Sequence, residues 1–220
     1  MKTIVVTSQK GGSAKTTLTA LLAVEAERAG DGPAWLIDTD KQGSLTRWHE
    51  RRQAETPQRA EIPFRDLAKG LEAIDSKHSG ALCFIDTAPA ISDQSAAIIR
   101  LADLVLIPVQ ASPSDLWAVA ETIELVRQAA KPFCFVITRA KAQASITAQS
   151  VAALSKHGRV AQHFMADRVA YAVALAGGNT APELQPKGSA AQETAALWQE
   201  LKSCIAETSK AVKKQKVRYG

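Results

Sequence analysis

The residues that decide the fold of this 220-residue chain are 9–17, which read Gln9-Lys10-Gly11-Gly12-Ser13-Ala14-Lys15-Thr16-Thr17. The common phosphate-loop pattern, G-x-x-x-x-G-K-[ST], fails here twice, at Gln9 and at Ala14. The variant K-G-G-x-x-K-[ST] fits in full. An apolar run precedes the stretch and a helical pattern follows it, which is the setting that a phosphate-binding loop requires.

The residue types in this stretch suit the phosphates of a nucleotide. Gly11 and Gly12 let the backbone turn its N–H groups toward a phosphate, and the start of the next helix adds partial positive charge. We expect Lys15 to contact the β- and γ-phosphate oxygens and Thr16 to offer its hydroxyl to Mg²⁺. We therefore assign Lys10 to Thr17 to nucleotide binding, and a glycine turn with two surface lysines is the competing interpretation.

Apolar runs and amphipathic segments alternate along the chain. The runs predict strands at 3–7, 34–38, 81–86, 104–109, 133–138 and 160–164. They are continuously apolar, as in strands that helices cover on both faces. Helices are predicted at 16–29, 64–76, 93–101, 113–130, 145–157 and from about 189 onward. The alternation predicts an α/β fold, a doubly wound and mostly parallel sheet that binds ligands at the carboxyl ends of its strands.

The net charge of +5 is concentrated at the end of the chain, because residues 201–220 hold six basic side chains and one acidic side chain. We divide the sequence into one domain, 1–208, and a basic tail, 209–220. A basic tail often serves solubility, but it also suits nucleic acid or an anionic membrane surface. The candidate DNA-binding residues are Lys210, Lys213, Lys214, Lys216 and Arg218.

Several other classes of protein are disfavoured by composition. No apolar run reaches the roughly 18 residues of a membrane span, and no signal peptide is evident, so we expect a cytoplasmic protein. The three cysteines, Cys83, Cys134 and Cys204, form neither a disulfide framework nor a CxxC site. The four histidines lack the spacing of metal ligands.

Two predicted strands end in acidic residues. The run 34–38 leads into Asp38-Thr39-Asp40, and the run 81–86 ends in Asp86. In a parallel sheet both ends lie at one edge, beside the phosphate loop. An apolar strand that ends in a carboxylate suits a Mg²⁺ ion held through water, which is the role we expect of Asp86. An ordinary acidic turn is the competing interpretation of Asp38 and Asp40.

Lys10, the D-x-D stretch and Asp86-Thr87-Ala88-Pro89 together resemble the ParA/MinD family of deviant Walker ATPases. The chain is most similar to small ParA proteins of the ParF type, through Asp38-Thr39-Asp40, Ser44-Leu45-Thr46 with Trp48, and Ile137-Thr138-Arg139. The resemblance covers nearly the whole chain and implies a phosphate-loop NTPase fold of the SIMIBI type. It implies a dimer around two ATP molecules, in which Lys10 reaches the phosphates of the partner. It further implies that Asp40 positions the attacking water and that Asp38 supports the Mg²⁺ shell.

The end of the run 133–138 supplies two further candidates from the same resemblance. Segments that contact the base in this family follow the corresponding strands, so Thr138 and Arg139 are candidates for nucleotide binding. An ordinary role at a strand end is the competing interpretation of these two residues.

Three residues of this chain depart from the family pattern, and Ala88, where the family often has proline, is the mildest departure. Ala14 stands where the family usually has glycine, and a left-handed backbone there would cost alanine about 1 kcal/mol. Lys41 replaces the proline that usually follows D-x-D. A nucleotide-binding scaffold that hydrolyses ATP negligibly is therefore an alternative. The presence of Lys10, Lys15, Asp40 and Asp86 argues against it.

The function that the resemblance implies is that of a slow, partner-stimulated ATP hydrolase that uses ATP/ADP and Mg²⁺ to partition a plasmid or chromosome. The ATP dimer would bind nonspecific DNA and associate with the nucleoid, and hydrolysis would release it. A centromere-binding or cargo adaptor of the ParB/ParG kind would stimulate hydrolysis. The alternatives are positioning of a protein cargo, such as chemoreceptor clusters, and a MinD-like ATPase at a membrane. The tail has few large apolar residues, so we expect no stable membrane insertion.

Overall fold

The computed structural model describes residues 1–90, 92–141 and 145–219, with side chains described through residue 208. Within these residues, seven strands form one sheet in the order β3-β2-β4-β1-β5-β6-β7, and every neighbouring pair is parallel. The strands are β1 (Lys2–Val6), β2 (Ala34–Asp38), β3 (Gln58–Arg59), β4 (Leu82–Asp86), β5 (Leu104–Gln110), β6 (Phe133–Thr138) and β7 (Arg159–Val160). The predicted α/β class with a parallel sheet is confirmed.

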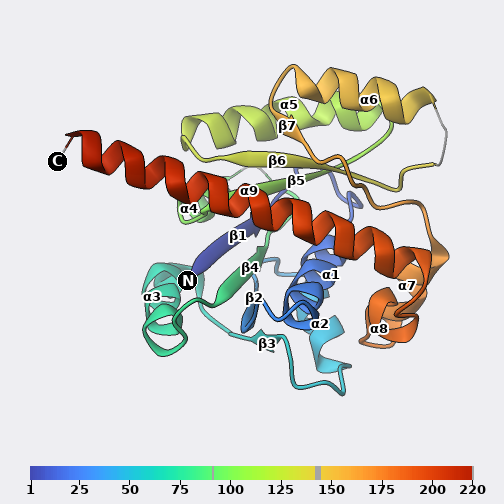
Figure 1. The fold of residues 1–220 in the computed structure, drawn as a ribbon, viewed down its shortest axis with the longest axis horizontal. Helices are drawn as coiled ribbons and strands as arrows, with labels where there is room; N and C mark the ends of the chain where they lie inside the picture. The colour runs from blue at the N-terminus through green and yellow to red at the C-terminus, as the bar shows by residue number, and fades with distance from the viewer. Residues whose placement is uncertain (91, 142–144, 220) are drawn as a thin grey trace.

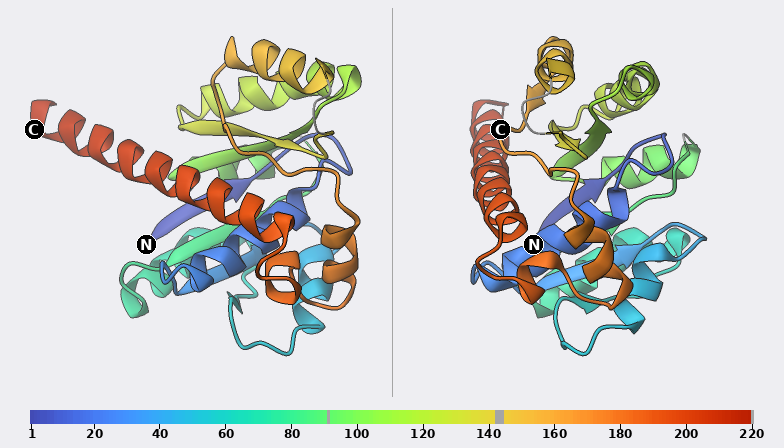
Figure 2. Two further views of the ribbon diagram at one scale, coloured as in Figure 1. Left: turned by 45° about the vertical axis from the view of Figure 1, so that its right-hand side comes forward. Right: turned by 90° about the vertical axis from the view of Figure 1, so that its right-hand side faces the viewer.

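Helices cover both faces of this sheet (Figures 1 and 2). They are α1 (Lys15–Arg28), α2 (Ser44–Glu50), a 3-10 turn η1 (Phe64–Asp66), α3 (Leu67–Lys77), α4 (Asp93–Arg100), α5 (Pro113–Gln128), α6 (Ser145–Ser155), α7 (Val169–Ala176), α8 (Ala181–Leu184) and α9 (Ser189–Tyr219). Helices α1 and α9 pack on one face, and α3 to α6 pack on the other. Among the described residues, no helix has the length and apolarity needed to cross a membrane.

The two cores of the molecule share the strands. In β1, Ile4 and Val6 face the layer of α1 and α9, whereas Val5 faces the opposite layer. All three side chains are at most 1% exposed. Because successive side chains of a strand point to opposite faces, a sheet covered on both sides needs apolar residues at every position. This is why the strands read as continuous apolar runs.

The register of the central strands positions the site. Val6 of β1 pairs with Asp86 of β4, and Asp38 of β2 pairs with the same Asp86. The carboxyl ends of these three neighbouring strands therefore meet at one edge, where the loop after β1 also begins. The expectation that the acidic strand ends lie together is met.

Some predicted elements differ from the structure. The run 160–164 contributes only the two-residue strand β7, and η1 precedes α3 in the predicted helix 64–76. Four elements, β3, α2, α7 and α8, were not predicted. Strand β3 and helix α8 have two and four residues, which is too short for a period to show. Helix α7 consists of valine, alanine, leucine and one tyrosine, so it lacks the polar face of an amphipathic helix.

The end of the chain continues the last helix. Helix α9 runs from Ser189 through Tyr219, across the boundary at 208 that we drew between domain and tail. The candidate DNA-binding side chains lie outside the described part of the structure, so their role stays a prediction: Lys210, Lys213, Lys214, Lys216 and Arg218.

Candidate nucleotide-binding site

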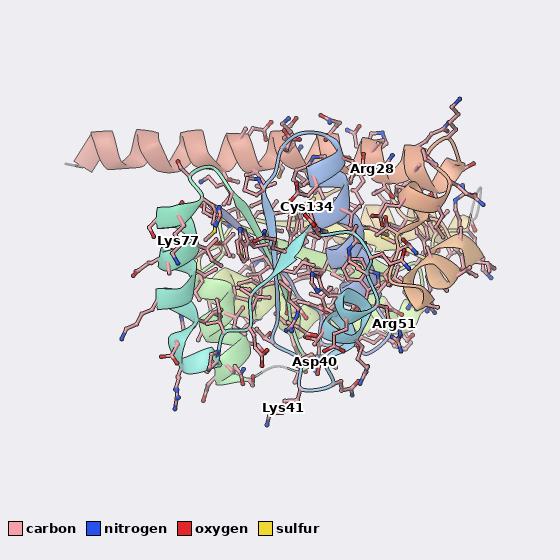
Figure 3. All side chains as sticks on the ribbon, turned by 90° about the horizontal axis from the view of Figure 1, so that it is seen from below. Arg28, Asp40, Lys41, Arg51, Lys77 and Cys134 are labelled. Carbon is pink, nitrogen blue, oxygen red and sulfur yellow. The ribbon has the colours of Figure 1, made fainter. Side chains whose placement is uncertain are left out.

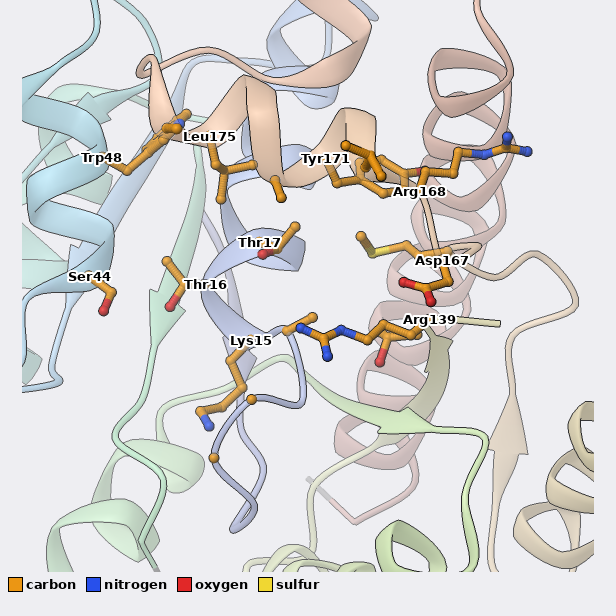
Figure 4. A pocket seen from close by; sticks show the side chains of 18 of the residues that line it. Lys15, Thr16, Thr17, Ser44, Trp48, Arg139, Asp167, Arg168, Tyr171 and Leu175 are labelled. Atoms are coloured by element: carbon orange, nitrogen blue, oxygen red, sulfur yellow. The ribbon is translucent and has the colours of Figure 1, made fainter. Parts of the chain in front are cut away.

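The edge where the central strands end opens into a cleft of about 940 Å³. The loop after β1 and the start of α1 form one side, and α2 and α7 form the other (Figure 4). Thr16 and Thr17 lie on the first side, across from Trp48 and Leu175, and Lys15 lies farther from these two residues, beside the loop. The residues that the sequence predicted and that line the cleft are Gly11, Gly12, Ala14, Lys15, Thr16, Thr17, Asp40, Thr138 and Arg139.

The backbone of the phosphate loop is accessible at its two glycines. A Cβ atom added at Gly11 or Gly12 would meet no heavy atom within 4 Å, so the space beside both glycines is free. Gly12 and Ala14 have φ angles of 77° and 71°, in the left-handed region. Successive N–H groups in such a turn form a concave site that suits an anion. The left-handed backbone that we considered for Ala14 is present, so the strain of about 1 kcal/mol applies to this chain.

Thr16 and Asp86 form the polar floor beside the loop. The Thr16 hydroxyl donates a hydrogen bond of 2.6 Å to Oδ2 of Asp86. Asp86 is 1% exposed, and its Oδ1 has no hydrogen-bond partner. Burial raises the pKa of Asp86 to about 7, and the neighbouring carboxylates of Asp38 and Asp40 add to the rise. This carboxylate therefore lies in a site where a positive charge would be strongly favoured.

These residues fit a Mg²⁺ ion bound together with a nucleotide. Mg²⁺ usually takes one or two protein oxygens and completes its shell with waters and phosphate oxygens. The unpartnered Oδ1 of Asp86 and the hydroxyl of Thr16 are oxygens of that kind. In the described ranges, no group of three or more His, Cys, Asp or Glu side chains forms a metal site without a nucleotide.

Lys15 is held inside the loop. Its side chain is buried, and Nζ donates a hydrogen bond of 3.3 Å to the carbonyl oxygen of Lys10. Burial lowers the pKa of Lys15, while the charges of Asp86 and Asp40 oppose that shift. The amine is therefore poised between the loop carbonyls and the acidic strand ends, where the phosphates of a nucleotide would lie.

Asp38 and Asp40 differ in their surroundings. Oδ1 of Asp38 accepts from the N–H of Asp40 at 3.0 Å, and Oδ2 accepts from the N–H and hydroxyl of Thr46 at 2.9 and 3.1 Å. Asp38 thus holds the start of α2, and its part in the Mg²⁺ shell stays a prediction. Asp40 lines the cleft and accepts from the N–H of Gln42 at 2.9 Å. Lys41 is exposed and points outward (Figure 3).

Lys10 does not line the cleft of its own chain. Its Nζ donates to Oδ2 of Asp115 at 2.5 Å and to the hydroxyl of Ser114 at 3.0 Å, both in the first turn of α5. Ser112 caps that helix, because the N–H of Asp115 donates to the Ser112 hydroxyl. The amine of Lys10 therefore lies beside α5, outside the cleft that holds Lys15.

Thr138 and Arg139 lie at the end of β6, beside the phosphate loop. The Thr138 hydroxyl donates a hydrogen bond of 3.1 Å to the carbonyl oxygen of Ser13, and Thr138 is fully buried. Arg139 is exposed and has a φ angle of 50°. Thr138 thus fixes the loop to β6, and contacts of either residue to a nucleotide base stay a prediction.

The far wall of the cleft contains residues that the sequence did not indicate. Residues 165–169 and α7 form it, and Glu193 of α9 fixes them from behind. The carboxylate of Glu193 accepts from the Arg168 guanidinium, the Tyr171 hydroxyl and the N–H of Ala166. No periodic pattern in the sequence predicts this wall, because hydrogen bonds to Glu193, which is distant in the sequence, hold its residues in place.

Helix α2 is pinned against the loop between α7 and α8. Trp48 donates from Nε1 to the carbonyl oxygen of Asn179 at 3.1 Å, and the Arg52 guanidinium lies 4.8 Å from the ring centroid of Trp48. Gly178 has a φ angle of 76°, and a Cβ there would lie 2.4 Å from the carbonyl carbon of Arg51. The spacing of Leu45 and Trp48 after Gly43 is the signal that could have indicated this helix.

Curated relatives match part of this chain. The maintenance of carboxysome distribution protein A of Halothiobacillus neapolitanus is 29% identical over 133 residues, 59% of this chain and 60% of the relative. Protein ParA of Rhizobium radiobacter is 29% identical over 132 residues, 58% of this chain and 57% of the relative. The matched region thus spans less than two thirds of either relative.

Solved structures share the fold. An ATP complex of a McdA variant from Cyanothece superposes with a TM-score of 0.73 at 21% identity and covers 94% of this chain and 96% of that one. MinD from Pyrococcus horikoshii, complexed with Mg-ADP, superposes with a TM-score of 0.76 at 13% identity and covers 94% and 98%. At residues 4–181 the sequence also matches the family described as the CobQ/CobB/MinD/ParA nucleotide binding domain. Fold, loop and family match agree, and the chain belongs to the CobQ/CobB/MinD/ParA family of nucleotide-binding domains.

Proposed function

We propose that this protein is a positioning ATPase that hydrolyses ATP with Mg²⁺ and binds DNA in its ATP state. The observation that carries the proposal is the buried, unpartnered oxygen of Asp86 beside the Thr16 hydroxyl, next to a loop with a free backbone. The relatives add support, since a related structure contains ATP and another contains Mg-ADP.

The residues of the cleft divide the chemistry of phosphoryl transfer between them. The N–H groups of the loop, the start of α1 and the Lys15 amine bind the phosphates and stabilise charge that develops on their oxygens. Mg²⁺, when bound, neutralises phosphate charge, and Thr16 and Asp86 are the residues that would hold it. Asp40 lines the cleft with one carboxylate oxygen on the Gln42 N–H, and it orients the attacking water.

Lys10 links ATP binding to formation of the dimer. Its amine lies outside its own cleft, beside Ser114 and Asp115. In the proposed ATP dimer it leaves this site and contacts the phosphates bound by the partner. The dimer then joins two basic tails, and avidity raises the affinity for nonspecific DNA. A cargo-bound adaptor protein stimulates hydrolysis, which releases the monomers.

The cargo has two candidates. A plasmid or chromosome region agrees with the name of the ParA relative. A protein body agrees with the relative named for carboxysome distribution. In this proposal, either cargo is positioned by the same cycle of ATP binding, binding to nucleoid DNA and hydrolysis. The cycle is therefore tested before the cargo.

The experiment measures binding of the full chain to nonspecific duplex DNA with ATP and with ADP, across a salt series. We expect binding with ATP only, which weakens steeply with salt because counterions are released. Lys10→Ala should bind ATP but form no ATP dimer in sedimentation, and Asp40→Ala should remain on DNA because it does not hydrolyse. Lys41→Ala removes a neighbouring exposed lysine and should behave like the wild type.

Three results would contradict the proposal. DNA binding that ignores the nucleotide would remove the ATP switch, and binding to anionic liposomes in its place would favour the membrane alternative. An unchanged ATP dimer of Lys10→Ala would exclude the partner-directed role of Lys10. Rapid hydrolysis by Asp40→Ala would exclude Asp40 from orienting the water.

A further inference from the structure

Trp117 of α5 is unusually exposed for its type. Its side chain has 78% of its surface accessible, the most among the large hydrophobic residues in the part of the chain that the structure describes. Trp48 and Trp198, by contrast, are 3% and 1% exposed. A tryptophan left in water forgoes the largest apolar burial of any side chain, and such residues commonly mark protein interfaces.

The position of Trp117 on α5 places it beside the loop that carries Lys10. Ser114 binds Lys10, and Glu121 binds the side chain of Gln9 at 2.6 Å. Trp117 lies three residues after the first and four before the second, so all three share one stripe of the helix. The indole therefore stands on the same surface as the Gln9-Lys10 segment.

A groove lies on the other flank of Trp117. Helices α5 and α6 lie side by side (Figures 1 and 2), and a groove of about 220 Å³ runs between them. Glu124, Arg127 and His157 are its polar lining residues. The apolar lining is larger and comes from both helices: Leu116, Val119, Ala120, Ile123, Ala153 and Leu154. Small-molecule sites usually measure about 300–1,000 Å³, so the groove suits one large side chain better than a ligand.

We infer that a second copy of this chain covers this surface and that Trp117 of each copy inserts into the α5–α6 groove of the other. The inference rests on the proposed ATP dimer, in which Lys10 faces the partner, and Trp117 continues the surface of Lys10. A two-fold interface is self-complementary, so a projecting side chain and a groove on one chain supply both halves of each contact. Tryptophan is the residue type that most often anchors such interfaces.

The arrangement gives the dimer two kinds of contact with different timing. Lys10 contributes only when ATP is present in the partner, because its target is a phosphate. The paired Trp117 contacts bury apolar surface whatever the nucleotide, but they do not hold the dimer alone, so the monomers separate once hydrolysis removes the phosphate that Lys10 contacts. ATP thus determines when the dimer forms, and the Trp117 contacts add to its stability.

The first test is the dissociation constant of the dimer, measured by sedimentation of the full chain with Mg²⁺ and a slowly hydrolysed ATP analogue. Trp117→Ala should raise the constant at least about tenfold. Trp117→Phe should raise it less, and binding of the analogue to dilute monomer should not change. Phe64→Ala is the matched control, since Phe64 is 42% exposed in η1 after β3, at the other end of the sheet order.

The second test asks whether tryptophan and groove meet in trans. Ala120→Phe fills the groove at an exposed position and should weaken the dimer as Trp117→Ala does. Mixing the two variants pairs one intact tryptophan with one open groove, so the mixture should dimerise more tightly than either variant alone. A mixture no tighter than the separate variants overturns the insertion.

The outcomes separate this inference from the proposed function. A wild type that stays monomeric with the ATP analogue removes the proposed dimer and the inference together. A wild-type dimer that Trp117→Ala leaves at full strength removes only the inference. In that case the surface around Trp117 belongs to another partner, and the ATP cycle stands.

Discussion

The two walls of the cleft are built by different means. The phosphate wall comes from the loop and first turn of α1 at residues 11–17 and from Asp40, which follows β2, with the buried Asp86 at the end of β4 beneath Thr16. The far wall comes from α2 and α7, and distant residues such as Glu183 and Glu193 hold it in place. Chemistry on the first wall is local in sequence, whereas the shape of the second depends on tertiary contacts.

The difference teaches where each kind of substitution should act. Under the proposed function, a substitution on the phosphate wall removes a group that contacts the reacting phosphates, so we expect it to lower turnover. A substitution of a residue that holds the far wall weakens binding of the whole nucleotide but leaves the reacting groups in place. We therefore expect it to raise KM. Four predictions test this division, beginning with the largest effect.

Asp86→Asn should lower Mg²⁺ affinity or ATP turnover about 10–100-fold, because a residue that holds a metal through water is lost. The measurement is hydrolysis across a Mg²⁺ titration. Asn has nearly the same shape and keeps the hydrogen bond from Thr16, so folding should be preserved. Unchanged turnover at low Mg²⁺ would show that this wall does not hold the metal.

The same carboxyl predicts a pH dependence. Its native pKa of about 7 lies above the ordinary value of 3.8, so without Mg²⁺ this carboxyl holds a proton below neutral pH. Mg²⁺ must displace that proton, and Mg²⁺-dependent ATP binding should therefore weaken up to about tenfold for each pH unit below 7. Without Mg²⁺, the free energy of unfolding should fall as the pH rises from about 4 to about 7, since the unfolded chain has already released this proton. Asp86→Asn should abolish both trends.

Glu193→Ala should raise KM for ATP about threefold to tenfold with kcat nearly unchanged, because hydrogen bonds to a charged group that fix the far wall are removed. Steady-state kinetics separate the two constants. Glu200→Ala is the matched control: Glu200 is on the same helix and accepts from the N–H groups of Gln162 and His163, which do not line the cleft. A fall in kcat without a rise in KM would contradict the division between the walls.

Ala14→Gly should have the smallest effect, a gain in stability of about 1 kcal/mol from relief of the left-handed backbone. Denaturant unfolding measures it. Ala130 follows α5 with a φ angle of 51°, so Ala130→Gly should stabilise the protein similarly. Only Ala14→Gly should also tighten ATP binding, because Ala14 lines the cleft and Ala130 does not. Equal ATP affinity in both variants would show that the methyl group of Ala14 does not disturb the nucleotide.

Sequence reasoning succeeded where the signal was local. The apolar strands and the loop at 9–17 predicted the sheet and the phosphate wall, and Asp86 lies at the end of β4 with Asp40 just after the end of β2. Each of these features is encoded within about ten consecutive residues. The spacing of the hydrophobic residues and the positions of the glycines were therefore sufficient to locate these features.

The far wall and the surroundings of Lys10 could not be predicted in the same way. Helix α7 has no amphipathic pattern, and its place in the cleft depends on Glu193, which lies 22 residues beyond Tyr171. Lys10 binds Asp115, 105 residues along the chain, and the sequence contains no sign of that pair. Contacts of this range are fixed by the packing of whole elements, which no window of sequence contains.

The close approach at Gly178 has a consequence for the diversification of this protein. A side chain at this position would overlap the backbone of Arg51, and the φ angle of 76° already disfavours any residue with a Cβ. Position 178 is therefore closed to substitution, although it lies outside the phosphate loop. The loop between α7 and α8 approaches α2 this closely only with glycine at position 178, so the shape of the cleft depends on a residue that touches no nucleotide-binding group.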